Sequence, residues 1–275
     1  MKIFLFVLNT VLILVYSSHG WIGNHQTALS FQPENQMTST SHALLLFPAA
    51  NTTTITDFSL CLWFNVFYFR KSSSYICSYA TSSKDNNEMN LGIRSSRIVL
   101  AAGSLYVDGF RRESLLLPGM WHHLCFVANG DRETGTFYLD KELTNEVPMS
   151  PRSILLNGSL VLGQETDVVA GSFQAQQSFS GLITGFNIFS RSLTTAEVMS
   201  LAACRSENLE GDVVSWNSAS WVLSGSVKPL DLQEEDYCHQ KRFRFVVFPK
   251  MMSPNAAIDM CASLKSELAL PPQPH

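Results

Sequence analysis

The sequence predicts an all-β protein, built as a two-sheet antiparallel sandwich of the jelly-roll type with one short α-helix. From Thr27 to about Leu230, short apolar runs alternate with turn residues, mainly Gly, Asn, Asp, Ser and Pro. The run from Phe58 to Phe67 carries large residues on both of its faces, as a strand inside a sandwich does. With 45% apolar residues among 275, the chain can bury a large core.

The chain begins with a segment, residues 1–20, that we expect to be a cleaved secretory signal. Lys2 precedes an apolar run from Ile3 to Tyr16, and Ser18 and Gly20 supply the small residues that a signal peptidase needs. An uncleaved anchor is the less favoured alternative, because the run is shorter than the roughly 20 residues of a spanning helix. We therefore expect a secreted protein or the extracellular part of a membrane receptor.

Composition agrees with that compartment. The net charge of −4 gives no basic field for nucleic acid. Six cysteines permit a full disulfide framework outside the cell, but the sequence alone leaves their pairing open. The sequons at Asn51 and Asn157 are expected to accept glycans on surface loops.

Further strands are expected along the chain, each bounded by turn residues: 98–102, 105–107, 122–127, 135–139, 160–162, 183–189 and 213–216. One helix interrupts them. Thr194 and Glu197 form a capping box, in which each side chain satisfies an exposed backbone amide at the helix start. Val198, Leu201 and Ala202 follow at helical spacing and are expected to face the sheet.

The stretch from Gly163 to Gly181 is rich in oxygen ligands. Glu165 and Asp167 lie one residue apart, and the amides of Gln174 and Gln177 follow among glycines and serines. Calcium takes six to eight oxygens from carboxylates, amides and main-chain carbonyls, and it tolerates an irregular loop. The alternative is a solvated hairpin loop without a metal.

Several ordered motifs of this chain resemble those of one family. His123-Leu124-Cys125 matches the start of the pentraxin signature, although Val127, Ala128 and Gly130 depart from the Ser or Thr, Trp, and Ser or Thr that follow there. The segments 163–167 and 177–181 fit the family's calcium loop, and 211–216 fits its closing strand. Residues 27–232 thus resemble a pentraxin domain, a jelly roll of the concanavalin and laminin-G type.

The resemblance implies a calcium site made from two distant parts of the chain. It would use Asp85, Asn86, Glu165, the Thr166 carbonyl and Asp167. A second calcium would share the acids and add Gln174 and Gln177. Gln174 stands where the family has an acid, and the lost charge predicts a weak or absent second site.

The resemblance also implies disulfides. Cys61 and Cys125 match the family's conserved bridge, which joins neighbouring strands inside the sandwich, and Cys204 pairs plausibly with Cys238. This layout resembles the pentraxin domains at the N-termini of adhesion G-protein-coupled receptors. We interpret Cys77 as a small buried hydrophobic residue.

Residues 238–275 are expected to form a small, incomplete α/β fragment. The alternation in Arg242 to Val247 predicts an amphipathic strand, with a heparin-binding patch as the alternative. A helix beginning at Ser253-Pro254 resembles the first helix of a C-type-lectin-like domain. The fragment is too short to bury a core, so we expect a truncated domain with Cys261 unpaired.

No catalytic set is predicted. His122 and His123 point to opposite faces of a strand, and no acid in the sequence pattern is placed to orient them. Glu165-x-Asp167 matches half of a jelly-roll glycosidase motif, but Ala170 occupies the position of the second glutamate. We expect a non-enzymatic recognition module that binds calcium and an anionic, glycan or matrix ligand, with homo-oligomers allowed. The alternative is a structural or adhesion domain of a receptor ectodomain with a vestigial metal loop.

Overall fold

The computed structural model of the chain describes residues 26–81, 88–94, 97–102, 105–109, 116, 118–150, 153–205, 209–238, 253 and 258. The chain divides into two compact units, Met1–His239 and Gln240–His275. Only Ser253 and Ile258 of the second unit are described, and Ile258 is helical and exposed. The signal segment 1–20, the strand expected at 242–247 and Cys261 lie outside the described residues.

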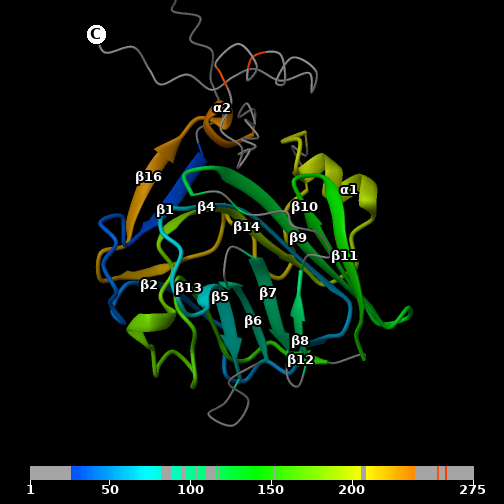
Figure 1. The fold of residues 1–275 in the computed structure, drawn as a ribbon. Coiled ribbons are helices and arrows are strands. Elements are labelled where there is room, and N and C mark those ends of the chain that lie inside the picture. Colours follow the sequence, from blue (N-terminus) through cyan, green and yellow to red (C-terminus); the bar gives the residue numbers. More distant parts are fainter. Residues whose placement is uncertain are drawn as a thin grey trace, which may run out of the picture. The chain divides into compact units, whose positions relative to one another are not determined.

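The first unit contains two seven-stranded sheets, and neighbouring strands in each sheet pair antiparallel (Figure 1). The first sheet has the order β11 (Glu142–Pro148), β10 (Thr134–Leu139), β9 (Trp121–Asn129), β4 (Phe58–Val66), β14 (Gly181–Phe189), β1 (Gln26–Phe31) and β16 (Lys228–Leu232). The second has the order β15 (Val222–Ser224), β2 (His42–Leu46), β13 (Ser159–Leu162), β5 (Ser74–Ala80), β6 (Met89–Arg94), β7 (Arg97–Ala102) and β8 (Leu105–Asp108). The short strands β3 (Thr54–Ile55) and β12 (Ile154–Leu155) pair separately. The predicted two-sheet sandwich is confirmed.

The core lies between the two sheets and is rich in aromatic residues. Phe64, Phe126, Phe137 and Phe186 are among its fully buried side chains. Every residue of β4 is buried, as its sequence predicts. One face of β4 contributes to this core, and its other face is covered by a helix and by the C-terminal end of the unit.

The helix α1 (Thr195–Leu201) begins at the predicted capping box. The Thr194 hydroxyl accepts from the Glu197 N–H at 3.3 Å, and Glu197 Oε2 accepts from the Thr194 N–H at 2.8 Å. Arg191 adds an ion pair to Glu197 at 2.6 Å. Val198 is fully buried against the outer face of the first sheet. The helix therefore covers a face of the sheet, as predicted.

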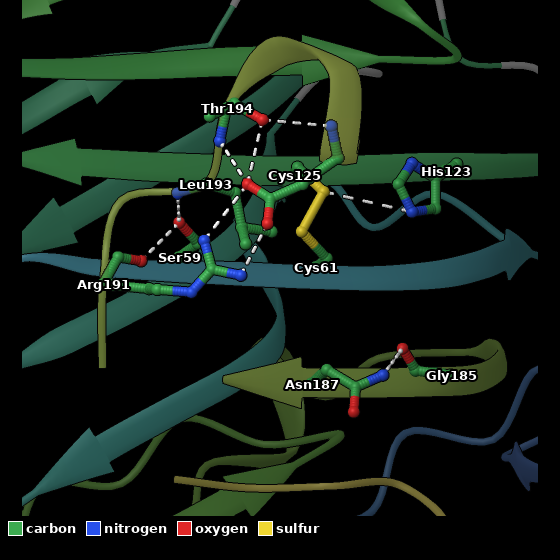
Figure 2. The surroundings of a disulfide bond; sticks show 10 residues. Ser59, Cys61, His123, Cys125, Gly185, Asn187, Arg191, Leu193 and Thr194 are labelled. Carbon is green, nitrogen blue, oxygen red and sulfur yellow. Dashed lines mark hydrogen bonds and ion pairs between the residues drawn. A yellow bond between two sulfur atoms is a disulfide. The ribbon is translucent and has the colours of Figure 1, made fainter. Parts of the chain in front are cut away.

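Cys61 and Cys125 are opposite each other on β4 and β9 and form a disulfide. Figure 2 shows this disulfide beside the segment that carries Leu193 and Thr194. Its apolar neighbours are Val198 and other residues beneath α1, not the residues between the sheets. The expectation of a bridge inside the sandwich is corrected in this respect, because odd positions of β4 face away from the core.

A second disulfide, Cys204–Cys238, joins the end of α1 to a four-residue helix, α2 (Glu234–Tyr237), which the sequence pattern did not predict. The Tyr237 ring packs 5.2 Å from that of Trp63 and 5.9 Å from that of Trp121, measured between centroids. The segment after β16 is thereby attached to the outer face of the first sheet.

One expected strand does not form. Residues 213–216 make only a single bridge, between Ile188 and Val214. The Asn187 side-chain oxygen accepts from the N–H groups of Gly211 at 3.0 Å and Trp216 at 3.4 Å. Backbone bonds join Val213 and Val214 to Ile188 alone, so the pairing does not extend into a strand. The other expected strands are present, with slightly different ends.

Among the residues that the structure describes, no helix has both the length and the apolar composition needed to span a bilayer.

Candidate metal centre

The loop from Gly163 to Gly181 connects β13 to β14 and is closed at its base. Phe179 donates its N–H to the Gly163 carbonyl, and Gly163 donates to the Ile76 carbonyl of β5, both at 2.9 Å. Gly163 has a φ of +86°, and a Cβ there would lie 2.4 Å from the ring of Phe31, so glycine is required. Phe179 is fully buried and contacts Phe31 edge-on. The loop is therefore fixed to the core at both ends.

Ser78 of β5 holds the first turn of the loop. Its hydroxyl accepts from the Thr166 N–H at 3.1 Å and donates to the Gln164 carbonyl at 2.9 Å. The Thr166 hydroxyl donates to the Gly171 carbonyl at 3.1 Å. Ser78 follows the core residue Cys77 along the strand, so it lies on the face away from the core. The loop thus lies on the outer face of the second sheet.

Amide side chains meet the two acidic residues of the loop. Asn90 Nδ2, on β6, donates to Glu165 Oε1 at 3.2 Å. Gln174 Nε2 donates to Asp167 Oδ2 at 3.2 Å. The Gln177 amide lies close enough to Glu165 to lower the pKa of its carboxyl. The structure thus brings together the acids and amides that the sequence predicted, and it adds Asn90.

Burial dominates the electrostatics of this cluster. Glu165 is only 4% exposed, and desolvation raises its pKa. The neighbouring charge of Asp167 raises it further, while the nearby amides of Asn90 and Gln177 oppose the change. The resulting pKa of Glu165 is about 7. A cation beside Glu165 would reverse this balance, because an opposite charge favours the ionised carboxylate.

The donor set fits a hard cation. Two buried oxygens, Glu165 Oε2 and Gln177 Oε1, have no hydrogen-bond partner among the described residues. A buried acceptor without a donor is costly, and a metal ion is one way to satisfy it. Carboxylate, amide and carbonyl oxygens are the ligands that calcium takes. The loop therefore offers Glu165, Thr166, Asp167 and Gln177 to such an ion.

The other half of the predicted site belongs to a different segment of the chain. Asp85 and Asn86 lie outside the described residues, so their distance from Glu165 stays a prediction.

Asn90 was missed by the sequence reasoning. It is 1% exposed and lies in a strand whose other residues are mainly apolar or glycine. Asparagine is depleted in strands, so a buried strand asparagine was the signal available. Its partner, however, is 75 positions away. Only the pairing of β5, β6 and β13 brings the two side chains together.

His122 requires a correction. Asp140 Oδ2 lies 2.7 Å from His122 Nδ1, so an acid does orient this histidine. The same carboxylate accepts from the His123 N–H at 2.9 Å. Asp140 belongs to the turn between β10 and β11, which pairing with β9 brings back to His122. His123 lies beside the Trp63 ring, 5.0 Å between centroids, so the two histidines do face apart.

The cysteines that the structure describes are structural residues and do not provide metal ligands or reactive thiols. Cys204, Glu234 and Cys238 lie close enough to share a metal, but the two cysteines form a disulfide and are not free ligands. Cys77 is fully buried, and burial raises the pKa of its thiol to about 12. A neutral, inaccessible thiol agrees with its interpretation as a hydrophobic residue.

The two sequons differ in setting. Asn51 lies in a turn, where its side-chain oxygen accepts from the Thr53 N–H at 2.9 Å. Asn157 precedes β13, its side-chain oxygen is buried, and the sequon hydroxyl of Ser159 is fully buried in the strand. Both asparagines are partly exposed, but only the second sequon has a fully buried hydroxyl. Glycosylation at either residue stays a prediction.

The sequence of this chain matches a family model and several known proteins. The family model described as "Pentaxin family" matches residues 30–229. Neuronal pentraxin-2 of Mus musculus is 34% identical over 187 residues, which cover 65% of this chain and 41% of that protein. The chain thus spans less than half of the length of this relative, and 26% of rat neuronal pentraxin-1.

Solved structures show the same fold. The native heptameric SAP-like pentraxin from Limulus polyphemus has a TM-score of 0.62 and 24% identity, covering 74% of this chain and 94% of that one. The extracellular region of zebrafish Gpr126/Adgrg6 has a TM-score of 0.54 and 17% identity, covering 75% of this chain and 26% of that one. Because the family model covers most of the two-sheet sandwich, this chain belongs to the pentaxin, or pentraxin, family.

Proposed function

We propose that this chain is an extracellular, non-enzymatic recognition module that binds one calcium ion in the 163–181 loop. The observation that carries the proposal is the pair Glu165 and Asp167, with the buried, unpartnered oxygens Glu165 Oε2 and Gln177 Oε1 beside it. Oxygen atoms of this kind bind calcium in irregular loops. The sequence prediction adds Asp85 and Asn86 to the ligands.

The role of the ion would be to hold an anionic ligand at the surface. Calcium bound by a loop on the outer face of a sheet can keep a coordination position open for an oxygen from outside. An anionic head group, a glycan or a matrix component could supply that oxygen. Gln174 is an amide that bonds to Asp167, so the charge count supports one calcium rather than two.

The proposal also includes an extracellular location, a binding rather than an enzymatic role, and self-association. The disulfides at Cys61–Cys125 and Cys204–Cys238 support an extracellular location, where such bonds persist. Ala170 stands where a jelly-roll glycosidase would need its second glutamate, which supports a binding role. The Limulus relative is a heptamer, and we extend the proposal to self-association of this chain, which light scattering measures.

A second function is favoured by one specific observation. Asn90 donates a hydrogen bond to Glu165, and Gln174 donates one to Asp167, so amide groups of the protein itself satisfy part of both acids. A loop stabilised in this way could be vestigial, and the chain would then be a structural or adhesion domain whose partners dock by protein surface.

Thermal melting with added calcium distinguishes the two functions. A ligand that binds only the native state raises the melting temperature as its concentration increases. We expect millimolar calcium to raise the melting temperature of the wild type, and Asp167→Ala to abolish this response. Asp231→Ala, on exposed β16, is the control and should retain it. A wild type that is indifferent to calcium would favour the adhesion function.

A further inference from the structure

We propose that Asn90 is a positioning residue for the metal: its amide fixes Glu165 Oε1 and thereby leaves Oε2 as the oxygen presented to calcium. This inference rests on the proposed calcium function and deepens it. It concerns only described residues, Asn90 on an interior strand of the second sheet and Glu165 in the loop that covers it.

The first step is the rigidity of the strand that carries Asn90. β6 pairs with β5 on one side and with β7 on the other, and Asn90 lies opposite Ser78 and Ala101. A side chain on a central strand is held more accurately than one on a loop. Ser78 on the neighbouring strand also bonds to the loop at Gln164 and Thr166. Asn90 and Ser78 together place Glu165 over the sheet.

The second step is the chemistry of a buried amide. Asn90 is 1% exposed, and a buried side-chain amide without a hydrogen-bond partner destabilises the folded state. An apolar residue would satisfy a strand position without that requirement. Asn90 instead donates to Oε1 of Glu165, which a neighbouring cation would keep ionised. A hydrogen bond to a charged group is stronger than one between neutral groups.

The third step is the difference between the two oxygens of Glu165. Oε1 accepts the Asn90 amide at 3.2 Å, whereas Oε2 is buried with no hydrogen-bond partner in the described part of the chain. If the carboxylate turned, the Asn90 bond would be lost. Asn90 therefore selects one orientation, in which Oε2 is available. Partners that orient metal ligands typically contribute 10–100-fold to metal affinity.

Asp167 provides a contrast. Its amide partner Gln174 is exposed, belongs to the same loop and is itself a predicted ligand, so it can exchange its donor for its oxygen when a metal binds. Asn90 comes from a different element and keeps its donor role. Asn90 thus positions a ligand of the metal, whereas Gln174 is itself a predicted ligand.

The experiment compares calcium affinity with stability in the metal-free state. Calcium is titrated by calorimetry into the whole chain carrying Asn90→Leu, which removes the donor, or Asn90→Ser, whose hydroxyl is too short to reach. We expect the dissociation constant to increase about tenfold or more in both variants. We also expect a lower melting temperature in EDTA, because Glu165 loses a hydrogen bond.

Asn187→Ser is the matched control. Asn187 is also a buried strand asparagine, but it bonds to Gly211 and Trp216 at the first sheet. Its loss should lower the melting temperature in EDTA while leaving the calcium dissociation constant unchanged. A merely structural role for Asn90 would give this same result.

A terbium probe gives a second measurement. The luminescence lifetimes of bound Tb³⁺ in H₂O and D₂O report the number of waters on the metal. We expect Asn90→Leu to add a water, because Glu165 Oε2 no longer faces the ion.

The outcomes separate the two proposals. A wild type that binds neither calcium nor terbium refutes the calcium function itself. A wild type that binds, together with folded Asn90 variants of unchanged or tighter affinity and unchanged hydration, overturns the role of Asn90 alone. If Asn90→Leu fails to fold, Asn90→Ser decides.

Discussion

At the scale of single residues, Glu165 shows how burial changes chemistry. The same carboxyl in water would be ionised at neutral pH, but desolvation and Asp167 raise its pKa to about 7. Three amides, from Asn90, Gln174 and Gln177, offset part of the cost of keeping two acids together. Near neutral pH, the Glu165 carboxyl can therefore either bind a proton or stay ionised beside a cation.

This balance predicts a pH dependence. The folded-state pKa of Glu165 is raised above its ordinary 4.5, so its contribution to the stability of the metal-free protein is full below about pH 4.5 and is lost as pH rises through about 7. The total loss is on the order of 3 kcal/mol. Calcium needs the carboxylate, so its affinity should increase over the same range.

Melting curves at pH 5 to 8, in EDTA and in calcium, test this prediction. The calcium-induced increase should be larger at pH 8 than at pH 6. Glu165→Gln is the control and should flatten the EDTA profile. A wild-type profile that is already flat in EDTA would show that Glu165 does not titrate in this range.

At the scale of elements, the short helix α1 depends on its cap and its buried side. Seven residues are too few for a helix to be stable alone. Thr194 and Glu197 satisfy backbone groups at its start. The hydrogen bond from Arg191, followed by that from the Thr194 backbone, lowers the pKa of Glu197 to about 2. Val198 then packs beneath it on the Cys61–Cys125 disulfide and its neighbours.

We expect Thr194→Ala to destabilise the chain by about 1 kcal/mol, because one backbone N–H loses its acceptor. Urea unfolding measures the change. Met199→Ala, an exposed substitution in the same helix, should change the free energy of unfolding by much less. Equal effects of the two variants would mean that the cap does not contribute.

At the scale of the whole first unit, the sandwich separates two regions. The 163–181 loop lies on the outer face of the second sheet, whereas α1, α2 and both disulfides lie on the side of the first sheet. The core between the sheets connects them but keeps their side chains apart. Changes in one region should therefore leave the other unaffected.

The Cys204–Cys238 disulfide allows this separation to be tested. The bond closes a loop of 34 positions, and the chain-entropy model gives about 4 kcal/mol for its loss. We expect the double variant Cys204→Ser and Cys238→Ser to lose stability of that order in urea, with an unchanged calcium dissociation constant. A large change in calcium affinity would show that the two sheet faces are coupled.

Much of the fold could be predicted from local pattern. The strand at Phe58, the capping box at Thr194 and the acid pair at Glu165 and Asp167 each follow from residues close together in sequence. The strand expected at 213–216 was wrong, because its pairing with β14 is limited to Ile188 and the Asn187 side chain bonds to Gly211 and Trp216. The pattern of residues 213–216 does not show this interaction, because Asn187 belongs to another strand.

The sequence by itself determined the all-β class and the turn-separated strands, and it predicted an oxygen-rich loop for an ion, because periodicity and residue chemistry are local properties. Only the tertiary structure decided that Asn90 meets Glu165, that Asp140 returns to His122, and that the first disulfide lies under α1. These neighbours depend on sheet order and on burial. Both arise when distant strands pair, and no short stretch of sequence encodes them.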